Sequence, residues 1–132
     1  IRLDTCTEKV IENCGNREET WISEEVKEVY RKLSKLDVIH SVEVFKDNKL
    51  IGGLYGISIM GMFIGESMFT VVSQSSKAAL VYLVNHLKQK GYTFLDVQLM
   101  NEHLRMFGAV EIDNDEYERL LDISFEKHIS FI

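Results

Sequence analysis

His40-Ser41-Val42-Glu43-Val44-Phe45 alternates broadly as a β-strand does, and two further apolar runs follow it, Leu50 to Ile59 and Met62 to Phe69. The polar turn Lys46-Asp47-Asn48-Lys49 separates the first two runs, and the tight turn Met60-Gly61 separates the last two. Three strands with such short connections predict an antiparallel meander. The glycines inside its central strand predict a bulge or the close approach of another backbone.

Helices are expected before the meander. Residues 2–14 have the pattern of a short extended segment followed by a helix. A second helix begins at Ser23, whose side chain can cap it ahead of Glu24 and Glu25. Apolar residues then recur at helical spacing, so one face of this helix is expected to pack inward: Val26, Val29, Tyr30 and Leu33.

After the meander, a long helix is predicted from the Ser73–Ser76 loop to about Lys90, ending at Gly91. Apolar residues, Val81 among them, cover most of its circumference, so it is expected to be largely buried. The remaining predicted elements are a strand over Tyr92–Leu99, a short helix from Asn101 to about Phe107, a last strand over Ala109–Ile112 and a helix over Asp115–Ile123.

The length and net charge of the chain indicate which classes of protein are unlikely. The chain has 132 residues and a net charge of −6, which suits one domain and argues against general affinity for nucleic acid. No apolar run is long enough to span a bilayer, so no membrane partner is expected. Cys6 and Cys14 are expected to be reduced thiols of a cytoplasmic protein. The histidines lack ligand spacing, so no metal is predicted.

The order of these elements predicts an α+β fold, a mostly antiparallel sheet covered by helices. It is similar to the order found in acyltransferase domains related to the N-acetyltransferases. Residues 1–132 are expected to form a single domain. Because the chain begins at Ile1 without an initiator methionine, it is expected to be a segment of a longer protein.

Three polar residues stand out within the apolar strands. Asp96 and Gln98 lie two apart, so on a strand both side chains would point to one face. Taken alone, the two residues favour an aspartate that pins a strand end. Glu66, between Gly65 and Ser67, needs a partner in an apolar sheet. Either it recognises a cationic group or an amine of a substrate, or it forms a structural ion pair with Lys77 or an arginine.

Seven short motifs occur in a characteristic order. They are Thr20-Trp21-Ile22, His40 to Phe45, Gly52-Gly53-Leu54-Tyr55-Gly56, Gly65-Glu66-Ser67-Met68-Phe69, Ser75 to Leu80, Asp96-Val97-Gln98 and Phe107 to Ile112. Together they closely resemble the leucyl/phenylalanyl-tRNA–protein transferase family. The resemblance runs from about Leu3 to Leu121.

The resemblance implies an aminoacyltransferase. Members of the family move Leu or Phe from aminoacyl-tRNA to the N-terminal amine of proteins that begin with Lys or Arg, which marks those proteins for degradation by the N-degron pathway. It also implies an acetyltransferase-like catalytic domain, here without the family's smaller N-terminal domain. The implied partners are the 3′ end of the aminoacyl-tRNA and the acceptor protein, and no cofactor is expected.

The resemblance also assigns roles to residues. Asp96 and Gln98 correspond to the catalytic centre, where Asp96 would orient the amine and the Gln98 side chain, or accept the proton. Glu66 would bind the acceptor, and Trp21 would contact the terminal adenosine or anchor its helix. Ser76 and Lys77 would hold a phosphate or merely begin a helix. The residues that match the apolar amino-acid pocket, although periodicity alone makes them core, are Leu54, Phe63, Met68, Leu80, Leu83, Leu87 and Leu95.

The chain departs from the family pattern in places. Thr70-Val71 stands where the family has Ser-Arg, and Asp113 stands where it has Pro. The basic residues left for tRNA are few: Lys77, Lys88, Lys90 and Arg105. Two alternatives therefore remain. One is an N-acyltransferase that uses acyl-CoA, which the lack of a glycine-rich pyrophosphate loop disfavours, and the other is a non-catalytic remnant that binds a peptide N-terminus.

Overall fold

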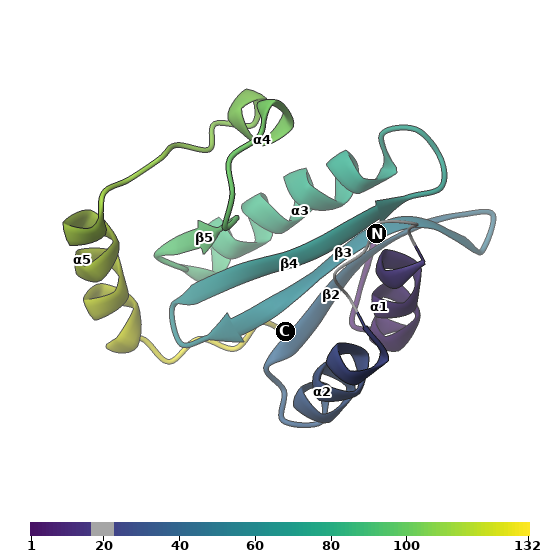
Figure 1. Cartoon of the computed structure of the whole chain (residues 1–132), viewed down its shortest axis with the longest axis horizontal. Helices are drawn as coiled ribbons and strands as arrows, with labels where there is room; N and C mark the ends of the chain where they lie inside the picture. Colours follow the sequence, from purple (N-terminus) through teal and green to yellow (C-terminus); the bar gives the residue numbers. More distant parts are fainter. Residues whose placement is uncertain (17–22) are drawn as a thin grey trace.

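A computed structural model describes residues 1–16 and 23–132 (Figure 1). Its elements are β1 (Arg2–Leu3), α1 (Thr7–Gly15), α2 (Glu24–Ser34), β2 (Ile39–Lys46), β3 (Lys49–Ile59), β4 (Met62–Thr70), α3 (Ser75–Lys90), β5 (Phe94–Asp96), α4 (Glu102–Met106) and α5 (Asn114–Phe125). The strands form one sheet in the order β1-β2-β3-β4-β5, with every pair antiparallel except β4 and β5. The predicted α+β class and the meander are confirmed.

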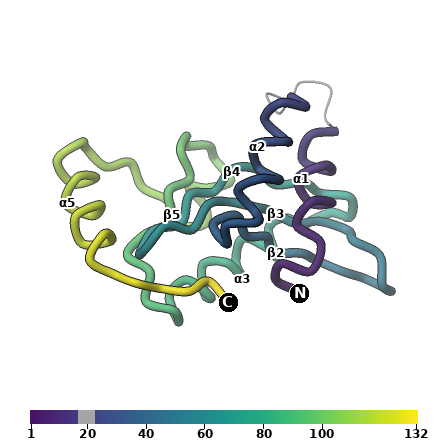
Figure 2. Tube along the Cα trace, turned by 90° about the horizontal axis from the view of Figure 1, so that it is seen from below, coloured from purple at the N-terminus to yellow at the C-terminus, as the bar shows by residue number. Residues whose placement is uncertain are grey.

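Helices cover both faces of this sheet. Figure 2 shows α3 on one face and α1 with α2 on the other. The alternation of side chains along the strands explains the two layers, because Leu54 packs in the cluster beneath α3 while its neighbour Tyr55 packs with α1 and α2. Each face therefore has its own hydrophobic core.

The glycines of β3 serve close packing, as predicted. A Cβ atom on Gly52 would collide with the Ser75 side chain at the start of α3, and one on Gly56 would collide with the Ile64 carbonyl. The β3–β4 register also shifts here, because Tyr55 pairs with Ser67 whereas Gly56 pairs with Gly65. Glu66 is left over as the extra residue of a bulge on β4.

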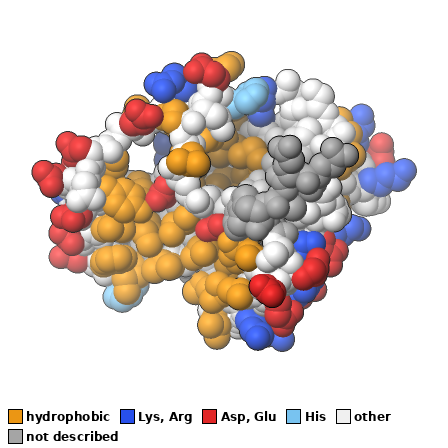
Figure 3. Space-filling model, viewed as in Figure 1, with side chains coloured by type: hydrophobic (Ala, Val, Ile, Leu, Met, Phe, Trp, Pro, Cys, Tyr) orange, Lys and Arg blue, Asp and Glu red, His pale blue; other side chains and the backbone are white. Residues whose placement is uncertain are grey.

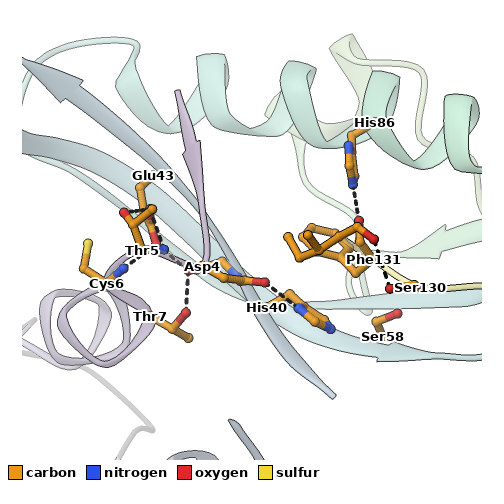
Figure 4. Close-up of polar contacts among 12 residues, drawn as sticks. Asp4, Thr5, Cys6, Thr7, His40, Glu43, Ser58, His86, Ser130 and Phe131 are labelled. Carbon is orange, nitrogen blue, oxygen red and sulfur yellow. Dashed lines mark hydrogen bonds and ion pairs between the residues drawn. The ribbon is translucent and has the colours of Figure 1, made fainter. Parts of the chain in front are cut away.

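The N-terminal segment is fastened to β2 by a buried carboxylate (Figure 4). Glu43 is fully buried and accepts hydrogen bonds from the backbone N–H groups of Thr5 (3.2 Å) and Cys6 (2.9 Å) and from the hydroxyls of Thr5 (2.6 Å) and Ser41 (2.7 Å). Four donors compensate the cost of burying this charge. They fix the entry into α1.

A second buried contact fastens the C-terminal tail to the α3 face. Phe131 stacks on the His40 ring with centroids 4.4 Å apart, and its carbonyl accepts a hydrogen bond of 2.6 Å from His86 Nε2 (Figure 4). His40 in turn lies 2.7 Å from Asp4 through its Nδ1 atom. Residues from both ends of the chain therefore meet on β2.

Two predicted strands differ from the structure. The strand predicted over Tyr92–Leu99 is only Phe94–Asp96, because after Asp96 the backbone turns and Gln98 adopts a left-handed φ of +66°. The strand predicted over Ala109–Ile112 is absent, since in the described ladder β5 is the edge and this segment pairs with no strand.

Two predicted buried residues are exposed. Val29 on α2 is 53% exposed and Val81 on α3 is 45% exposed, because each of these helices presents only one face to the sheet. Among the described residues, no helix is both long and apolar enough to cross a membrane.

Candidate functional site

The candidate site lies where β4 and β5 separate. The two strands pair in parallel from Met62–Phe94 to Ile64–Asp96, and beyond that point β4 continues through Gly65 and Glu66 while β5 ends. A cavity of about 270 Å³ occupies this fork. Figure 3 shows a hollow with hydrophobic side chains on the face where α4 and β4 lie.

The lining of the fork cavity is largely apolar. It comprises Leu54, Tyr55, Gly65, Glu66, Ser67, Met68, Leu80, Leu83, Leu95, Val97, Leu99, Asn101 and Leu104. Among the predicted pocket residues, Phe63 and Leu87 are missing from it. Both are buried in the hydrophobic cluster that also contains Leu54, Leu80 and Leu83.

Seven lining residues were not among the predicted site residues: Tyr55, Gly65, Ser67, Val97, Leu99, Asn101 and Leu104. Val97 and Leu99 alternate with Leu95, and this period of two could have identified them as one wall. Asn101 and Leu104 belong to the beginning of α4, where the Asn101 side chain caps the helix by accepting a hydrogen bond of 2.9 Å from the Leu104 N–H. No sequence signal placed this short helix over the cavity.

Asp96 is held at both of its carboxylate oxygens. Oδ1 accepts a hydrogen bond of 2.7 Å from the backbone N–H of Gln98, and Oδ2 accepts one of 2.7 Å from the Tyr117 hydroxyl on α5. The expectation that Asp96 would orient the side chain of Gln98 therefore needs correction. Its contact is with the Gln98 backbone, because Gln98 lies in a turn and no longer on the strand.

Gln98 reaches across the fork. Its side-chain Nε2 donates a hydrogen bond of 2.9 Å to the carbonyl of Gly65 on β4. Because Gly65 lines the cavity, this amide lies at the cavity's edge. Asp96 and Gln98 are themselves absent from the lining, which takes the alternate residues Leu95, Val97 and Leu99. Asp96 and Gln98 therefore lie next to the fork cavity but do not line it.

Glu66 projects from the β4 bulge and lines the fork cavity. Its Oε2 accepts a hydrogen bond of 2.8 Å from the Tyr30 hydroxyl on α2, and the Tyr30 ring packs edge-on against Tyr55 at 5.3 Å. Burial, together with the neighbouring Glu66 carboxylate, raises the pKa of the Tyr30 hydroxyl. The described residues provide Glu66 with no ion pair to Lys77 or an arginine, so its structural partner is a tyrosine.

A second cavity of about 330 Å³ adjoins the first. The two share Met68, Leu80, Asn101 and Leu104 in their linings. The second cavity extends to the first turn of α3 and is lined there by Ser76 and Lys77, with His103 of α4 also in its lining. Ser76 accepts a hydrogen bond of 2.6 Å from the Thr70 hydroxyl, which ties α3 to the end of β4.

Trp21 lies outside the described residues. Within them, no three histidine, cysteine, aspartate or glutamate side chains are grouped so that they could hold a metal ion. Of the predicted polar residues, Glu66 lines the fork cavity, Gln98 reaches its edge through the bond to Gly65, and Ser76 and Lys77 line the adjoining cavity.

The fold is similar to that of a solved acetyltransferase. An aminoglycoside acetyltransferase from an uncultured soil metagenomic sample, in complex with sisomicin, matches with a TM-score of 0.53 at 14% sequence identity. The match covers 81% of each chain. This likeness supports the acetyltransferase-like architecture and says nothing of the substrate.

Sequence comparison is more specific. The family model described as leucyl/phenylalanyl-tRNA protein transferase matches residues 1–122. The transferase of that name from Chlorobaculum tepidum is 47% identical over 136 residues, which cover 100% of this chain and 70% of the relative. The one from Nitrobacter winogradskyi is 44% identical and covers 99% of this chain and 60% of the relative. The chain belongs to the leucyl/phenylalanyl-tRNA–protein transferase family.

Proposed function

We propose that this protein transfers leucine or phenylalanine from aminoacyl-tRNA to the N-terminal amine of a protein that begins with Lys or Arg. This marks the acceptor for degradation by the N-degron pathway in the cytoplasm. The observation that carries the proposal is the apolar fork cavity bordered by a carboxylate–amide pair and a second carboxylate. Family membership supports the transfer reaction.

The fork cavity is the proposed site of the donor's side chain. A volume of about 270 Å³ and walls of Leu54, Leu83 and Leu95 suit an apolar side chain. Met68 is adaptable, so one pocket can take both a branched and an aromatic group. An apolar wall rejects polar side chains strongly but separates apolar ones poorly, which agrees with two accepted amino acids.

The reaction joins an amine to an activated ester. The amine nitrogen attacks the ester carbonyl carbon, the bond to the ribose oxygen breaks, and the proton lost by the amine ends on that oxygen. An α-amine has an ordinary pKa near 8, so a useful fraction is neutral at pH 7. Positioning can therefore supply much of the rate acceleration.

Gln98 and Asp96 are the proposed positioning centre. With Nε2 of Gln98 engaged by Gly65, its Oε1 is the atom that accepts an N–H of the incoming amine. Asp96 holds the turn that carries Gln98. Because both Asp96 oxygens already accept hydrogen bonds, the geometry favours this orienting role over proton abstraction.

Glu66 is proposed to bind the acceptor. Its Oε2 is engaged by Tyr30, and its other oxygen would receive the α-amine or the cationic side chain of an N-terminal Lys or Arg. Ser76 and Lys77 would meet a phosphate near the 3′ end of the tRNA, since the first backbone N–H groups of α3 have no partner within the helix. Trp21 would stack on the terminal adenosine.

One assay tests the proposal. Labelled Leu-tRNA is incubated with the protein and a peptide that begins with Arg, with the same peptide beginning with Glu as the acceptor control. Labelled acetyl-CoA replaces the tRNA in a parallel reaction. Label that enters only the Arg peptide, and only from the tRNA, supports the proposal. Label from acetyl-CoA alone identifies an N-acyltransferase, and label from neither indicates a non-catalytic binding domain.

A further inference from the structure

The helix α5 contributes a side chain to the candidate centre that no sequence motif indicated. Tyr117 lies 21 positions after Asp96, yet its hydroxyl donates a hydrogen bond of 2.7 Å to Asp96 Oδ2. Its ring packs edge-on against Phe94 on β5, with centroids 5.6 Å apart. Two separate contacts therefore hold Tyr117 beside the end of β5. Figure 1 shows α5 beyond the β5 edge of the sheet.

The hydroxyl completes the restraint on the carboxylate. An aspartate side chain that accepts one hydrogen bond can still rotate about it, whereas engagement of both oxygens fixes the carboxylate plane. Here the Gln98 N–H holds Oδ1 and Tyr117 holds Oδ2. Hydrogen bonds to an ionised acceptor are also stronger than neutral ones.

The fixed carboxylate in turn holds Gln98 in an unfavourable conformation. The left-handed φ of +66° at Gln98 is disfavoured for a residue with a side chain. Two hydrogen bonds oppose its relaxation, one from the Gln98 N–H to Asp96 and one of 2.8 Å from the Leu99 N–H to the Val97 carbonyl. This backbone conformation aims the side-chain amide at Gly65. A continuous chain of hydrogen bonds thus runs from α5 through Asp96 and Gln98 to β4.

We infer that Tyr117 is a positioning residue for the Asp96–Gln98 pair, an assignment that rests on the proposed transfer function. It contacts neither donor nor acceptor and acts only through Asp96. The hydrogen bond to Asp96, with burial, raises the pKa of the Tyr117 hydroxyl, which agrees with a donor that remains protonated throughout the reaction.

The test replaces the hydroxyl and keeps the ring. Tyr117→Phe retains the packing against Phe94 and removes one oxygen atom. Tyr82→Phe is the matched control, because Tyr82 stacks on His86 and lines neither cavity. Both variants are assayed with Leu-tRNA and the Arg peptide, at a temperature where circular dichroism shows each to be folded. In a separate experiment, carbon NMR of labelled tyrosine measures the pKa of the Tyr117 hydroxyl in wild type and in Asp96→Asn.

The expected result is a kcat about tenfold lower in Tyr117→Phe, with KM for Leu-tRNA unchanged, as the loss of one hydrogen bond to a charged group predicts. Tyr82→Phe should retain the wild-type kcat, and Asp96→Asn should lower the pKa of the Tyr117 hydroxyl. If wild type transfers leucine and Tyr117→Phe matches it, the inference is overturned while the proposed function stands. If wild type transfers nothing, the proposed function falls and this role falls with it. If the Tyr117 hydroxyl has the same pKa in Asp96→Asn as in wild type, the hydrogen bond between Tyr117 and Asp96 does not form in solution, and the inference is overturned.

Discussion

The side-chain amide of Gln98 donates a 2.9 Å hydrogen bond to the carbonyl of Gly65, and this bond spans the fork between β4 and β5. It links the strand that carries Glu66 to the turn that follows Asp96. Below the fork, the parallel pairing that ends at Ile64 and Asp96 holds the two strands together, and the Gln98 side chain adds a contact beyond it.

Gln98→Glu tests this link with a substitution of nearly equal shape. A carboxylate cannot donate to the Gly65 carbonyl, so the link is lost and the two oxygens repel each other. We expect kcat to fall about 100-fold, the scale of one misplaced catalytic contact, with little change in KM for the donor. Steady-state kinetics with varied Leu-tRNA measure both constants, and a wild-type kcat in this variant would remove Gln98 from the mechanism.

Tyr30→Phe tests the support of the acceptor carboxylate. The substitution removes the donor to Glu66 Oε2 and keeps the ring contact with Tyr55. Glu66 should then be less well positioned, so KM for the Arg peptide should rise about tenfold while KM for Leu-tRNA stays constant. If KM for Leu-tRNA rises instead, Glu66 belongs to the donor site.

Met68→Phe tests the donor pocket. Met68 lines both cavities, and a larger, stiffer ring there reduces the space for an aromatic donor more than for leucine. Transfer from Phe-tRNA should fall about tenfold relative to transfer from Leu-tRNA, in the range expected for a change of one or two methylene groups in an apolar pocket. The measurement is the ratio of kcat/KM for the two donors. An unchanged ratio would place the donor side chain elsewhere.

Stability should decline at alkaline pH through the buried tyrosines. Burial raises the pKa of Tyr30 and of Tyr55, so the folded state favours their neutral forms. Their contribution to stability is complete below the ordinary tyrosine pKa of about 10 and is lost as pH rises above it. Urea unfolding between pH 8 and pH 11 should show this decline. Tyr55→Phe should flatten it, whereas an equally steep decline in that variant would contradict the assignment.

Glu43→Gln tests the anchor of the N-terminal segment. The amide keeps one acceptor oxygen but places an NH₂ group against donors that Glu43 now binds, among them the Cys6 N–H and the Ser41 hydroxyl. The free energy of unfolding should fall by about 2 kcal/mol, the cost of leaving buried donors unsatisfied. Urea denaturation measures the change, and Glu116→Gln on the exposed face of α5 is the control. Equal stability would show that the network is dispensable.

Local signals predicted much of the fold. Alternation and short turns identified β2, β3 and β4, and capping residues located helix starts, as at Ser23, whose Oγ accepts a hydrogen bond of 3.2 Å from the Val26 N–H. The failures involve tertiary contacts. The length of β5 is set by the turn that Asp96 stabilises, and the segment over Ala109–Ile112 has apolar residues but no neighbouring strand.

Only part of the candidate site could be predicted, because the contacts around it also join distant segments. The resemblance predicted Asp96, Gln98 and Glu66 as site residues, but the partners that they contact come from distant segments. Tyr30 lies 36 residues before Glu66, and Tyr117 lies 21 residues after Asp96. No periodicity relates such pairs, because the contacts depend on how α2 and α5 dock. Trp21 stays a prediction.

The central claim is that the donor's side chain occupies the fork cavity. A crystal structure of the protein with a non-hydrolysable 3′-phenylalanylamido-adenosine tests it most directly. We expect the phenyl ring between Leu54, Leu83 and Leu95, with the amide carbonyl beside Gln98. A ring bound outside the fork, with the cavity still empty, would contradict it.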